Sequence, residues 1–478
     1  MGTNSIKSAA IISIIGKYSN VLIQLIYTAI LGRILSPQEF GVVAVITVFL
    51  TFFTLVSNMG IGPAIVQNKT INDIDIKSLF ALTFYIGTIT AALFSLFSYP
   101  ISLFYSNDAY ISIGILLAIS LFFNTINIVP NALLLKELKF KIIAFRTVVV
   151  GIGSAIPTIY LATIGFSYYS IVIHSILVAL ITFFWNYFST STQIAFKVKK
   201  ESINKIKEFS KFQFGFSVIN YFSRNIDNLL IGRYLGESQL GYYNRSYQLM
   251  IMPVTYLTNS ITPVLHPILS KHEDNKDYIY KKYVQVLKIL SIIGVFVSVF
   301  TFFSAREIIL ILFGSQWEGS IRSLQFLSLS IWAQMLLSSS GSIFQSINKT
   351  KLLMISSVIT TTITILAIIL GVLTKNINII ALLISISYNL RLFFTFYILI
   401  NIGLKKKYLQ FIYEFVVDII LIMVLIVSFL IYNKIFVVSN LIPSLLIKLV
   451  YLGTIYICLL LLTGKLKFFY NSLFKRKI

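Results

Sequence analysis

Fourteen long apolar runs, separated by short polar loops, limit most strongly what this chain can fold into. A helix of about 20 mostly apolar residues crosses about 30 Å of hydrocarbon, where every backbone polar group must be satisfied internally. The runs lie at residues 8–35, 40–58, 78–101, 110–134, 142–164, 167–187, 212–235, 240–266, 283–303, 321–346, 351–373, 376–402, 411–432 and 440–463. We therefore predict an all-α polytopic membrane protein with about 14 transmembrane helices.

The composition supports this class and excludes several kinds of site. Only 12% of the 478 residues are charged, whereas a soluble domain averages about 25%. The single cysteine, Cys458, excludes a disulfide framework, and the three histidines lack zinc-ligand spacing, so no metal site is predicted. The net charge of +23 is spread over many short loops, which argues against nucleic-acid binding.

The distribution of basic residues predicts the orientation of the chain. With a cytoplasmic N-terminus, 26 of the 39 lysines and arginines fall on inside segments, 7 on outside loops or outer helix ends, and 6 within spans. Cytoplasmic loops carry the excess of Lys and Arg in membrane proteins. Both termini are therefore predicted to be cytoplasmic. No loop is long enough for a soluble catalytic domain.

Two segments of the sequence repeat each other at a spacing of 200 residues, 31–41 and 231–241. Such a duplication in a membrane protein is typical of transporters. Each copy contains six spans, and an even number gives both copies the same orientation. The identical pairs are Gly32 and Gly232, Arg33 and Arg233, Leu35 and Leu235, and Gly41 and Gly241.

The repeat predicts four parts of the chain. They are an N-terminal lobe at 1–188, a basic cytoplasmic linker at 189–211, a C-terminal lobe at 212–403, and two appended spans with a basic tail at 404–478. The linker is either an interfacial segment bound to anionic lipid or an ordinary cytoplasmic loop.

Polar residues inside the spans are the candidate functional residues, because a charge at mid-membrane is costly and usually faces a bundle interior or a watery cavity. One helix face of the first span and the equivalent face of the seventh carry polar stripes at spacings of three and four. These stripes either face a shared cavity or pack within their own repeat. The predicted cavity residues are Lys17, Asn20, Gln24, Arg146, Asn220, Arg224 and Arg391.

Asp227 lies three residues after Arg224, so the two side chains can pair on one helix face. The pair is either a permanent ion pair or a switch in which Asp227 takes a proton or Na⁺ and releases Arg224 to an anion. The motif residues Arg33 and Arg233 fall at external helix ends, where they either gate the path or anchor a turn.

Three other ionisable residues within spans receive different interpretations. We expect Lys288 and Lys448 to extend from near the ends of their helices to water. Asp418 has no assigned function. The predicted cavity is therefore positive, which suits an anionic substrate, since arginine binds phosphate with forked hydrogen bonds.

Several motifs resemble those of the Wzx-type polysaccharide flippases, which belong to the multidrug/oligosaccharidyl-lipid/polysaccharide exporter superfamily. The similarity is strongest to the branch exporting colanic-acid-like and teichuronic-acid-like polymers. The resembling segments are 31–41, 58–68, 226–236, 241–263 and 312–317.

The resemblance implies two six-helix lobes that form a V and work by alternating access. It implies a flippase, with no enzymatic activity, that moves undecaprenyl-pyrophosphate-linked oligosaccharide for O-antigen, capsule or exopolysaccharide synthesis. It also implies that Lys17, Arg224 and Arg391 line the cavity and that Asp227 is the acidic residue of the second lobe. Na⁺ or H⁺ as coupling ion, and a polymerase and chain-length machinery as partners, follow from the same resemblance.

Two alternatives stay open. A cation-coupled multidrug exporter of the same superfamily would be expected to have twelve spans and an acidic cavity. A membrane glycosyltransferase or polymerase would be expected to have a sizeable external loop with catalytic carboxylates or arginines.

Overall fold

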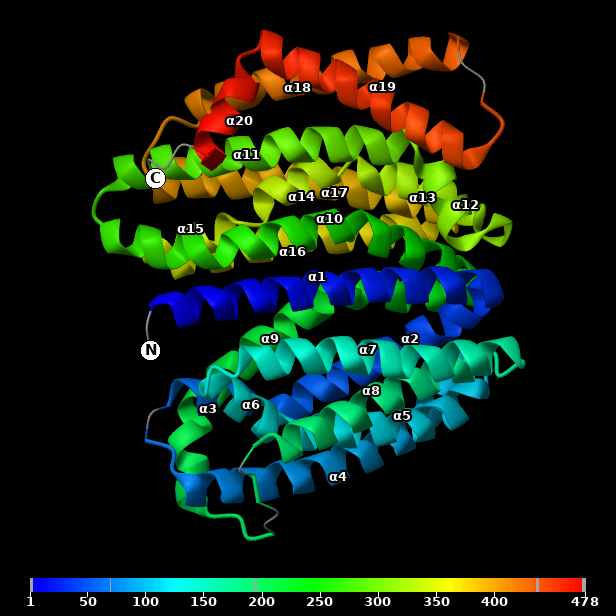
Figure 1. Ribbon diagram of the computed structural model, residues 1–478, viewed down its shortest axis with the longest axis vertical. Coiled ribbons are helices and arrows are strands. Elements are labelled where there is room, and N and C mark those ends of the chain that lie inside the picture. Colours follow the sequence, from blue (N-terminus) through cyan, green and yellow to red (C-terminus); the bar gives the residue numbers. More distant parts are fainter. Residues whose placement is uncertain (1–2, 69, 191, 194–195, 436–437, 475–478) are drawn as a thin grey trace. The chain divides into compact units, whose positions relative to one another are not determined.

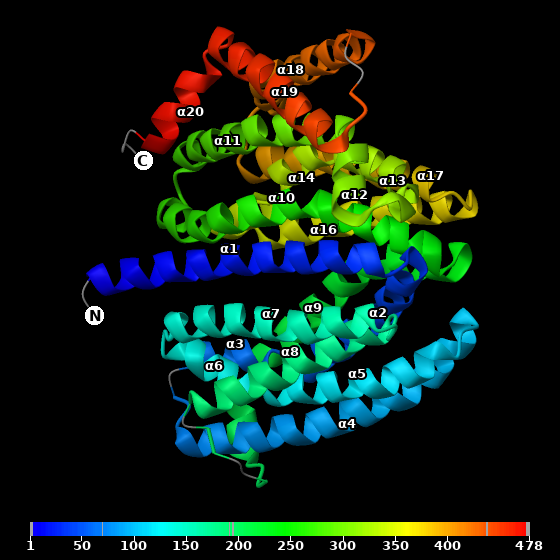
Figure 2. The same cartoon turned by 45° about the vertical axis from the view of Figure 1, so that its right-hand side comes forward.

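The protein is all-helical in the described part of the chain (Figure 1, Figure 2). The computed structural model describes residues 3–68, 70–190, 192–193, 196–435 and 438–474. Within these ranges it describes all side chains except those of residues 3–15, 207–220, 222–224, 259–264, 266–268, 435 and 473–474. The chain divides into two compact units, Met1–Gly241 and Tyr242–Ile478.

The first unit is built from long helices that pack in neighbouring pairs. The pairs α4 with α5, α1 with α7, and α5 with α8 lie against each other, and α2 packs against α9. Its helices are α1 (Thr3–Ile34), α2 (Pro37–Asn58), α3 (Ile61–Gln67), α4 (Asp73–Tyr105), α5 (Ala109–Ile126), α6 (Ile128–Lys136), α7 (Phe140–Thr163), α8 (Tyr169–Phe188), α9 (Lys200–Leu235) and the first residues of α10 (Glu237–Leu269).

The second unit contains the rest of α10 and the helices that follow it. Here α16 packs along α17, and α11 lies between α14 and α18. The helices are α11 (Lys276–Phe303), α12 (Ala305–Phe313), α13 (Gly319–Ser328), α14 (Ile331–Leu337), α15 (Ser340–Ser346), α16 (Thr350–Leu373), α17 (Ile377–Phe396) with a π-helical extension (Tyr397–Gly403), α18 (Tyr408–Ile435), α19 (Leu441–Leu462) and α20 (Lys465–Phe474).

Ten segments in the described part of the chain are long and apolar enough to cross a membrane. At most 44% of the most apolar window of each is buried inside the protein. Much of the remaining surface is apolar, including Leu96, Leu366 and Phe188, which are exposed. A multi-pass membrane protein is thereby confirmed, because only lipid makes so large an apolar surface favourable. The total of fourteen spans stays a prediction.

The tenth predicted run, residues 321–346, is not one continuous helix. It is divided into α13, α14 and α15. The hydroxyls of Ser330, Ser338 and Ser340 each donate to the carbonyl oxygen three residues earlier, at 2.7, 2.6 and 2.7 Å. Serine hydroxyls that bond nearby carbonyls compete with helical hydrogen bonds and favour bends. The prediction of one span here missed this local chemistry.

The helix ends are defined by local sequence signals. Ser36 and Glu39 form a capping box at the start of α2, and Asn72 and Asp75 form one at the start of α4. Gly60, with φ 75°, lies in the left-handed region between α2 and α3, where a Cβ would be strained. The second predicted span, residues 40–58, therefore lies within α2, and the break follows it.

The start of α9 is bound to the rest of the first unit through a buried carboxylate. Asp75 accepts hydrogen bonds from Ser202 Oγ at 2.8 Å and from Lys205 Nζ at 2.5 Å. Asn68 Nδ2 also donates to the carbonyl of Lys205 at 3.1 Å. Part of the predicted linker thus belongs to α9, and binding of this linker to lipid stays a prediction.

The duplicated glycines mark a close crossing of two helix starts. A Cβ on Gly41 would lie 1.9 Å from the carbonyl oxygen of Glu237, and a Cβ on Gly241 would lie 2.0 Å from that of Pro37. Pro37 and Glu237 are themselves 200 residues apart. Such reciprocal contacts are what a local two-fold relation produces. Glycine at these sites is therefore required by close backbone approach.

We predict that Gly41→Ala destabilises the protein by about 1–3 kcal/mol or more, the usual cost of overpacking. The added methyl group must displace the backbone of α10. The measurement is the thermal midpoint of the purified protein in detergent. The matched control is Gly153→Ala in α7, where nothing lies within 4 Å of the new Cβ. Equal midpoints for the two variants would contradict the close crossing.

Candidate functional site

Most described charged residues inside the spans have a protein partner. Lys448 on α19 forms a salt bridge of 2.6 Å with Glu307 on α12, and Ser444 Oγ donates to the same carboxylate oxygen at 2.8 Å. Lys448 also donates to the carbonyl of Phe303 at 3.0 Å. Extension of Lys448 to water was expected, but the lysine binds a buried carboxylate instead.

A second group of ion pairs attaches α18. Asp418, which is fully buried, accepts a hydrogen bond from Lys465 at 2.6 Å. Lys288 on α11 pairs with Glu414 at 2.6 Å, which replaces the expectation that Lys288 extends to water. The Lys288 pair joins α18 to α11, and the Asp418 pair joins α18 to α20. They reduce the cost of burying each charge, and they give Asp418 a structural role.

Arg391 differs from these lysines. It lies in the segment Ile377–Gly403, with 14 residues before it and 12 after it. Its guanidinium carbon lies 5.1 Å from the ring centroid of Tyr388, a cation–π contact. Its Nε is buried without a hydrogen-bond partner, and no described carboxylate lies within salt-bridge distance. A half-buried arginine of this kind is available to an anion.

Arg146 in the first unit is held by carboxamides. Its Nη1 donates to Asn131 Oδ1 at 3.2 Å and to Asn186 Oδ1 at 2.6 Å. Asn186 Nδ2 then donates to Asn127 Oδ1 at 2.8 Å. Three helices, α6, α7 and α8, are thus joined by one polar chain. The positive charge of Arg146 remains, but its hydrogen bonds are directed to protein oxygens.

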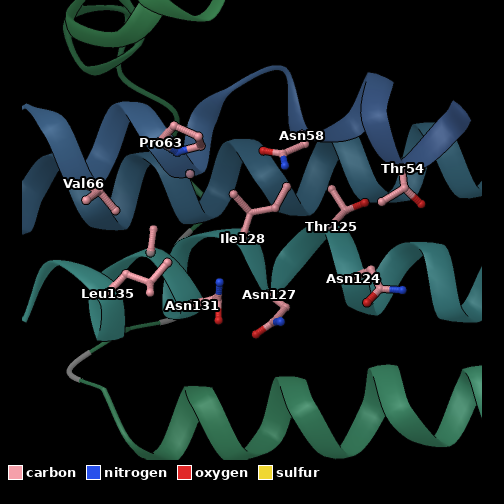
Figure 3. A pocket seen from close by; sticks show the side chains of 12 residues that line it. Thr54, Asn58, Pro63, Val66, Asn124, Thr125, Asn127, Ile128, Asn131 and Leu135 are labelled. Carbon is pink, nitrogen blue, oxygen red and sulfur yellow. The ribbon is translucent and has the colours of Figure 1, made fainter. Parts of the chain in front are cut away.

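A cavity of about 640 Å³, hereafter the polar pocket, lies beside the hydrogen-bonded asparagines Asn127 and Asn131. Figure 3 shows it between α2–α3 and α5–α6. It is confined to the first unit. The described residues that line it are Thr54, Asn58, Gly62, Pro63, Val66, Asn124, Thr125, Asn127, Ile128, Asn131, Ala132 and Leu135.

The polar stripe of α1 is divided between two environments. Lys17 and Gln24 are exposed. Asn20 lies against α7, with its Oδ1 3.3 Å from the position of a Cβ on Gly151. Tyr27 stacks on His174 of α8, with ring centroids 4.3 Å apart. The assignment of Lys17, Asn20 and Gln24 to a transport cavity stays a prediction.

The stripe of α9 is only partly described. The side chains of Asn220 and Arg224 lie outside the described residues. Asp227 is buried, with 6% of its surface exposed, and its Oδ1 accepts a hydrogen bond from the amide of Asn228 at 2.8 Å. The proposed pairing of Asp227 with Arg224 therefore stays a prediction.

The two motif arginines are exposed at the ends of their helices. The guanidinium carbon of Arg233 lies 5.0 Å from the ring centroid of Phe104. This contact would anchor a turn, and a gating role for Arg33 and Arg233 stays a prediction.

The sequence analysis did not predict the asparagines of the polar pocket as functional residues, although their spacing can be read from the sequence. Asn124, Asn127 and Asn131 follow at intervals of three and four within the fourth predicted span. This is the spacing that identified the stripe at Lys17. The stripe carries no charge and lies outside the repeated motif, so the signals that predicted the cavity residues do not include it.

Comparisons with known proteins show similarity to polysaccharide biosynthesis proteins. A family model described as polysaccharide biosynthesis protein matches residues 30–322. An uncharacterized membrane protein in the cps region of Klebsiella pneumoniae is 26% identical over 355 residues, 70% of this chain and 69% of that protein. The teichuronic acid biosynthesis protein TuaB of Bacillus subtilis is 24% identical over 346 residues, 71% of each chain.

The fold is also similar to a solved structure. The lipid II flippase MurJ, in an inward closed conformation, matches with a TM-score of 0.75 at 16% sequence identity. The match covers 97% of this chain and 99% of that one. At this identity the similarity shows a shared fold.

We predict that Lys448→Met destabilises the protein by about 3–5 kcal/mol, because it leaves Glu307 buried without its cation. The double variant Glu307→Gln with Lys448→Met should recover much of this loss. Thermal midpoints of the purified protein in detergent measure both. Lys406→Met, which breaks the exposed pair with Asp277, is the control and should change little. Additive losses in the double variant would contradict the pairing.

Proposed function

The chain belongs to the polysaccharide biosynthesis protein family, and from this premise we propose that it is a flippase for lipid-linked oligosaccharide. The substrate would be an oligosaccharide repeat unit on undecaprenyl pyrophosphate. The protein would move it across the bacterial inner membrane by alternating access, for cell-surface polysaccharide synthesis, without catalysing a reaction. A polymerase and chain-length machinery are the proposed partners.

The observation that carries this proposal is the state of Arg391. Burying a charged group without a partner costs free energy, so an arginine at mid-span without a described anion suggests that its partner is a ligand. Pyrophosphate is such a ligand, since guanidinium groups bind phosphate oxygens with forked, charge-assisted hydrogen bonds. The paired lysines Lys288 and Lys448 cannot serve in this way without first losing their carboxylates.

Further support comes from α1 and from the relatives. Lys17 is exposed near the middle of α1, and no described carboxylate pairs with it. TuaB is named for teichuronic acid biosynthesis and MurJ for flipping lipid II. A polysaccharide in the first name and a flipped lipid in the second together favour a lipid-linked saccharide as the substrate. We propose Arg224 as a further cation that binds the substrate anion.

Asp227 is the proposed coupling residue. It is buried in α9, and a buried carboxylate gains or loses a proton or Na⁺ with a large change in local charge. Binding of either cation at Asp227 would free Arg224 to bind the substrate anion. The cytoplasmic position of both termini is likewise proposed from the distribution of basic residues.

We predict that Arg391→Ala lowers surface polysaccharide by about tenfold to a hundredfold, because one charge-assisted hydrogen-bonded contact contributes about 1.5–3 kcal/mol. Arg391→Lys should keep part of the export, since it keeps the charge but not the forked geometry. The measurement is surface polymer and accumulated lipid-linked intermediate in a strain lacking the gene, complemented by each variant. Arg322→Ala, at an exposed arginine of α13, is the matched control.

Membrane levels of every variant must equal those of the unmodified protein. Normal export by Arg391→Ala would contradict the role of this arginine. Normal polymer in the deletion strain, together with new sensitivity to drugs, would support the multidrug exporter and overturn the flippase.

A further inference from the structure

We propose that the polar pocket binds the sugar part of the transported lipid, and that the pyrophosphate binds elsewhere. This inference rests on the proposed function and assigns a ligand to a site in the first unit. The pocket is lined by four asparagines and two threonines. Its volume of about 640 Å³ lies within the range of about 300–1,000 Å³ that is usual for small-molecule sites.

Arg146 determines which atoms the asparagines offer to a ligand. A guanidinium only donates hydrogen bonds, so the atoms of Asn131 and Asn186 that face Arg146 must be carboxamide oxygens. Asn186 Nδ2 in turn donates to Asn127 Oδ1 at 2.8 Å. The oxygens of Asn127 and Asn131 therefore each accept one hydrogen bond already, and their Nδ2 groups remain as donors. In Figure 3, Nδ2 of Asn131 points to the α3 side and its oxygen points away.

Asn58, on the α2 side of the pocket, and Asn124, on α5, add groups of both kinds (Figure 3). The side chain of Asn58 makes no hydrogen bond with any described residue, so its carboxamide offers both a donor and an acceptor. Asn124 uses its Nδ2 on Ser120 at 3.2 Å and keeps its oxygen. The pocket thus presents several neutral donors and at least two acceptors. A sugar hydroxyl both donates and accepts, and matches this mixture.

The remaining lining distinguishes a sugar from other ligands. No charged side chain is among the described lining residues, so the pocket is poorly suited to pyrophosphate. Pro63, Val66, Ile128 and Leu135 supply apolar surface, on which the C–H face of a sugar ring can pack. Burying the asparagine amides against a purely apolar drug would leave them unsatisfied, at a cost in affinity.

The interrupted helices explain why such a pocket exists in an apolar unit. Asn58 ends α2 just before the left-handed residues Met59 and Gly60. Asn127 lies between α5 and α6. The two breaks face each other across the cavity (Figure 3). Irregular backbone at membrane depth is tolerated where it lines a cavity.

The test places a photoreactive residue at the pocket in the full-length protein, in cells that make the polymer. The variants are Val66→p-benzoylphenylalanine and Leu135→p-benzoylphenylalanine, both at exposed apolar side chains. Tyr388→p-benzoylphenylalanine reports on the site at Arg391, and Leu366→p-benzoylphenylalanine on an exposed surface of α16. After irradiation, each purified protein is treated with mild acid, which cleaves the bond between sugar and pyrophosphate. Mass spectrometry then identifies what stays attached.

We expect adducts at Val66 and Leu135 that carry sugar and lipid before acid and only sugar after it. A sugar adduct that never carries lipid would show a free saccharide and overturn the lipid-linked ligand. Adducts that lose sugar and keep lipid would overturn the inference, as would sugar-bearing adducts at Tyr388 alone. Absence of sugar-bearing adducts at all four positions would overturn the proposed function itself.

A side-chain variant adds a second measurement. Asn58→Ala should reduce the sugar adduct at Leu135 about fivefold, the effect of losing one or two neutral hydrogen bonds. Asn58 has no described hydrogen bond to lose within the protein, so folding should be unaffected. Asn440→Ala, at an exposed asparagine before α19, is the control and should leave the yield unchanged. Equal yields in both variants would exclude Asn58 from sugar recognition.

Discussion

The compensation of charge inside apolar helices determines how this protein is built and where it can bind. An ion within the hydrocarbon region must find a counter-ion, a set of dipoles or a ligand. Lys448 and Lys288 use carboxylates of neighbouring helices, and these pairs attach the appended spans. Arg146 uses the oxygens of two asparagines. Arg391 has only an aromatic face in the described part of the chain, and for this reason we propose it as the site of an external anion.

The duplicated motif acts through its glycines more than through its arginines. Gly41 and Gly241 let the starts of α2 and α10 approach until their backbones touch. The reciprocity of the contact explains why the same residue stands at equivalent positions of both copies. Arg33 and Arg233, in contrast, lie at exposed helix ends. Sequence repetition thus marks the scaffold here, whereas the proposed cations Lys17 and Arg224 stand at positions where the two copies have diverged.

The sequence predicts the helices well because the signal for a membrane helix is local. Each of the fourteen runs falls on a helix or on consecutive short helices. It predicts the break of residues 321–346 poorly, because hydropathy does not register serine hydroxyls that bend a helix. The ion pairs between helices were harder to predict. Glu307 and Lys448 are 141 residues apart, and no local sequence pattern links them. The stripe of Asn124, Asn127 and Asn131 was predictable from its spacing. It is a weaker signal than a charged stripe, because a neutral side chain costs less to bury in a membrane than a charge.

The position of Arg146 explains how one unit can bind a sugar without holding it too strongly. A guanidinium inside the polar pocket would favour phosphates and would bind them with strong, charge-assisted bonds. Placed behind Asn131 and Asn186, it instead orients neutral carboxamides and polarises their donors. Each such contact contributes only about 0.5–1.5 kcal/mol, so several are needed for selectivity and none prevents release. A carrier needs this balance, because a substrate that is bound too tightly is released slowly.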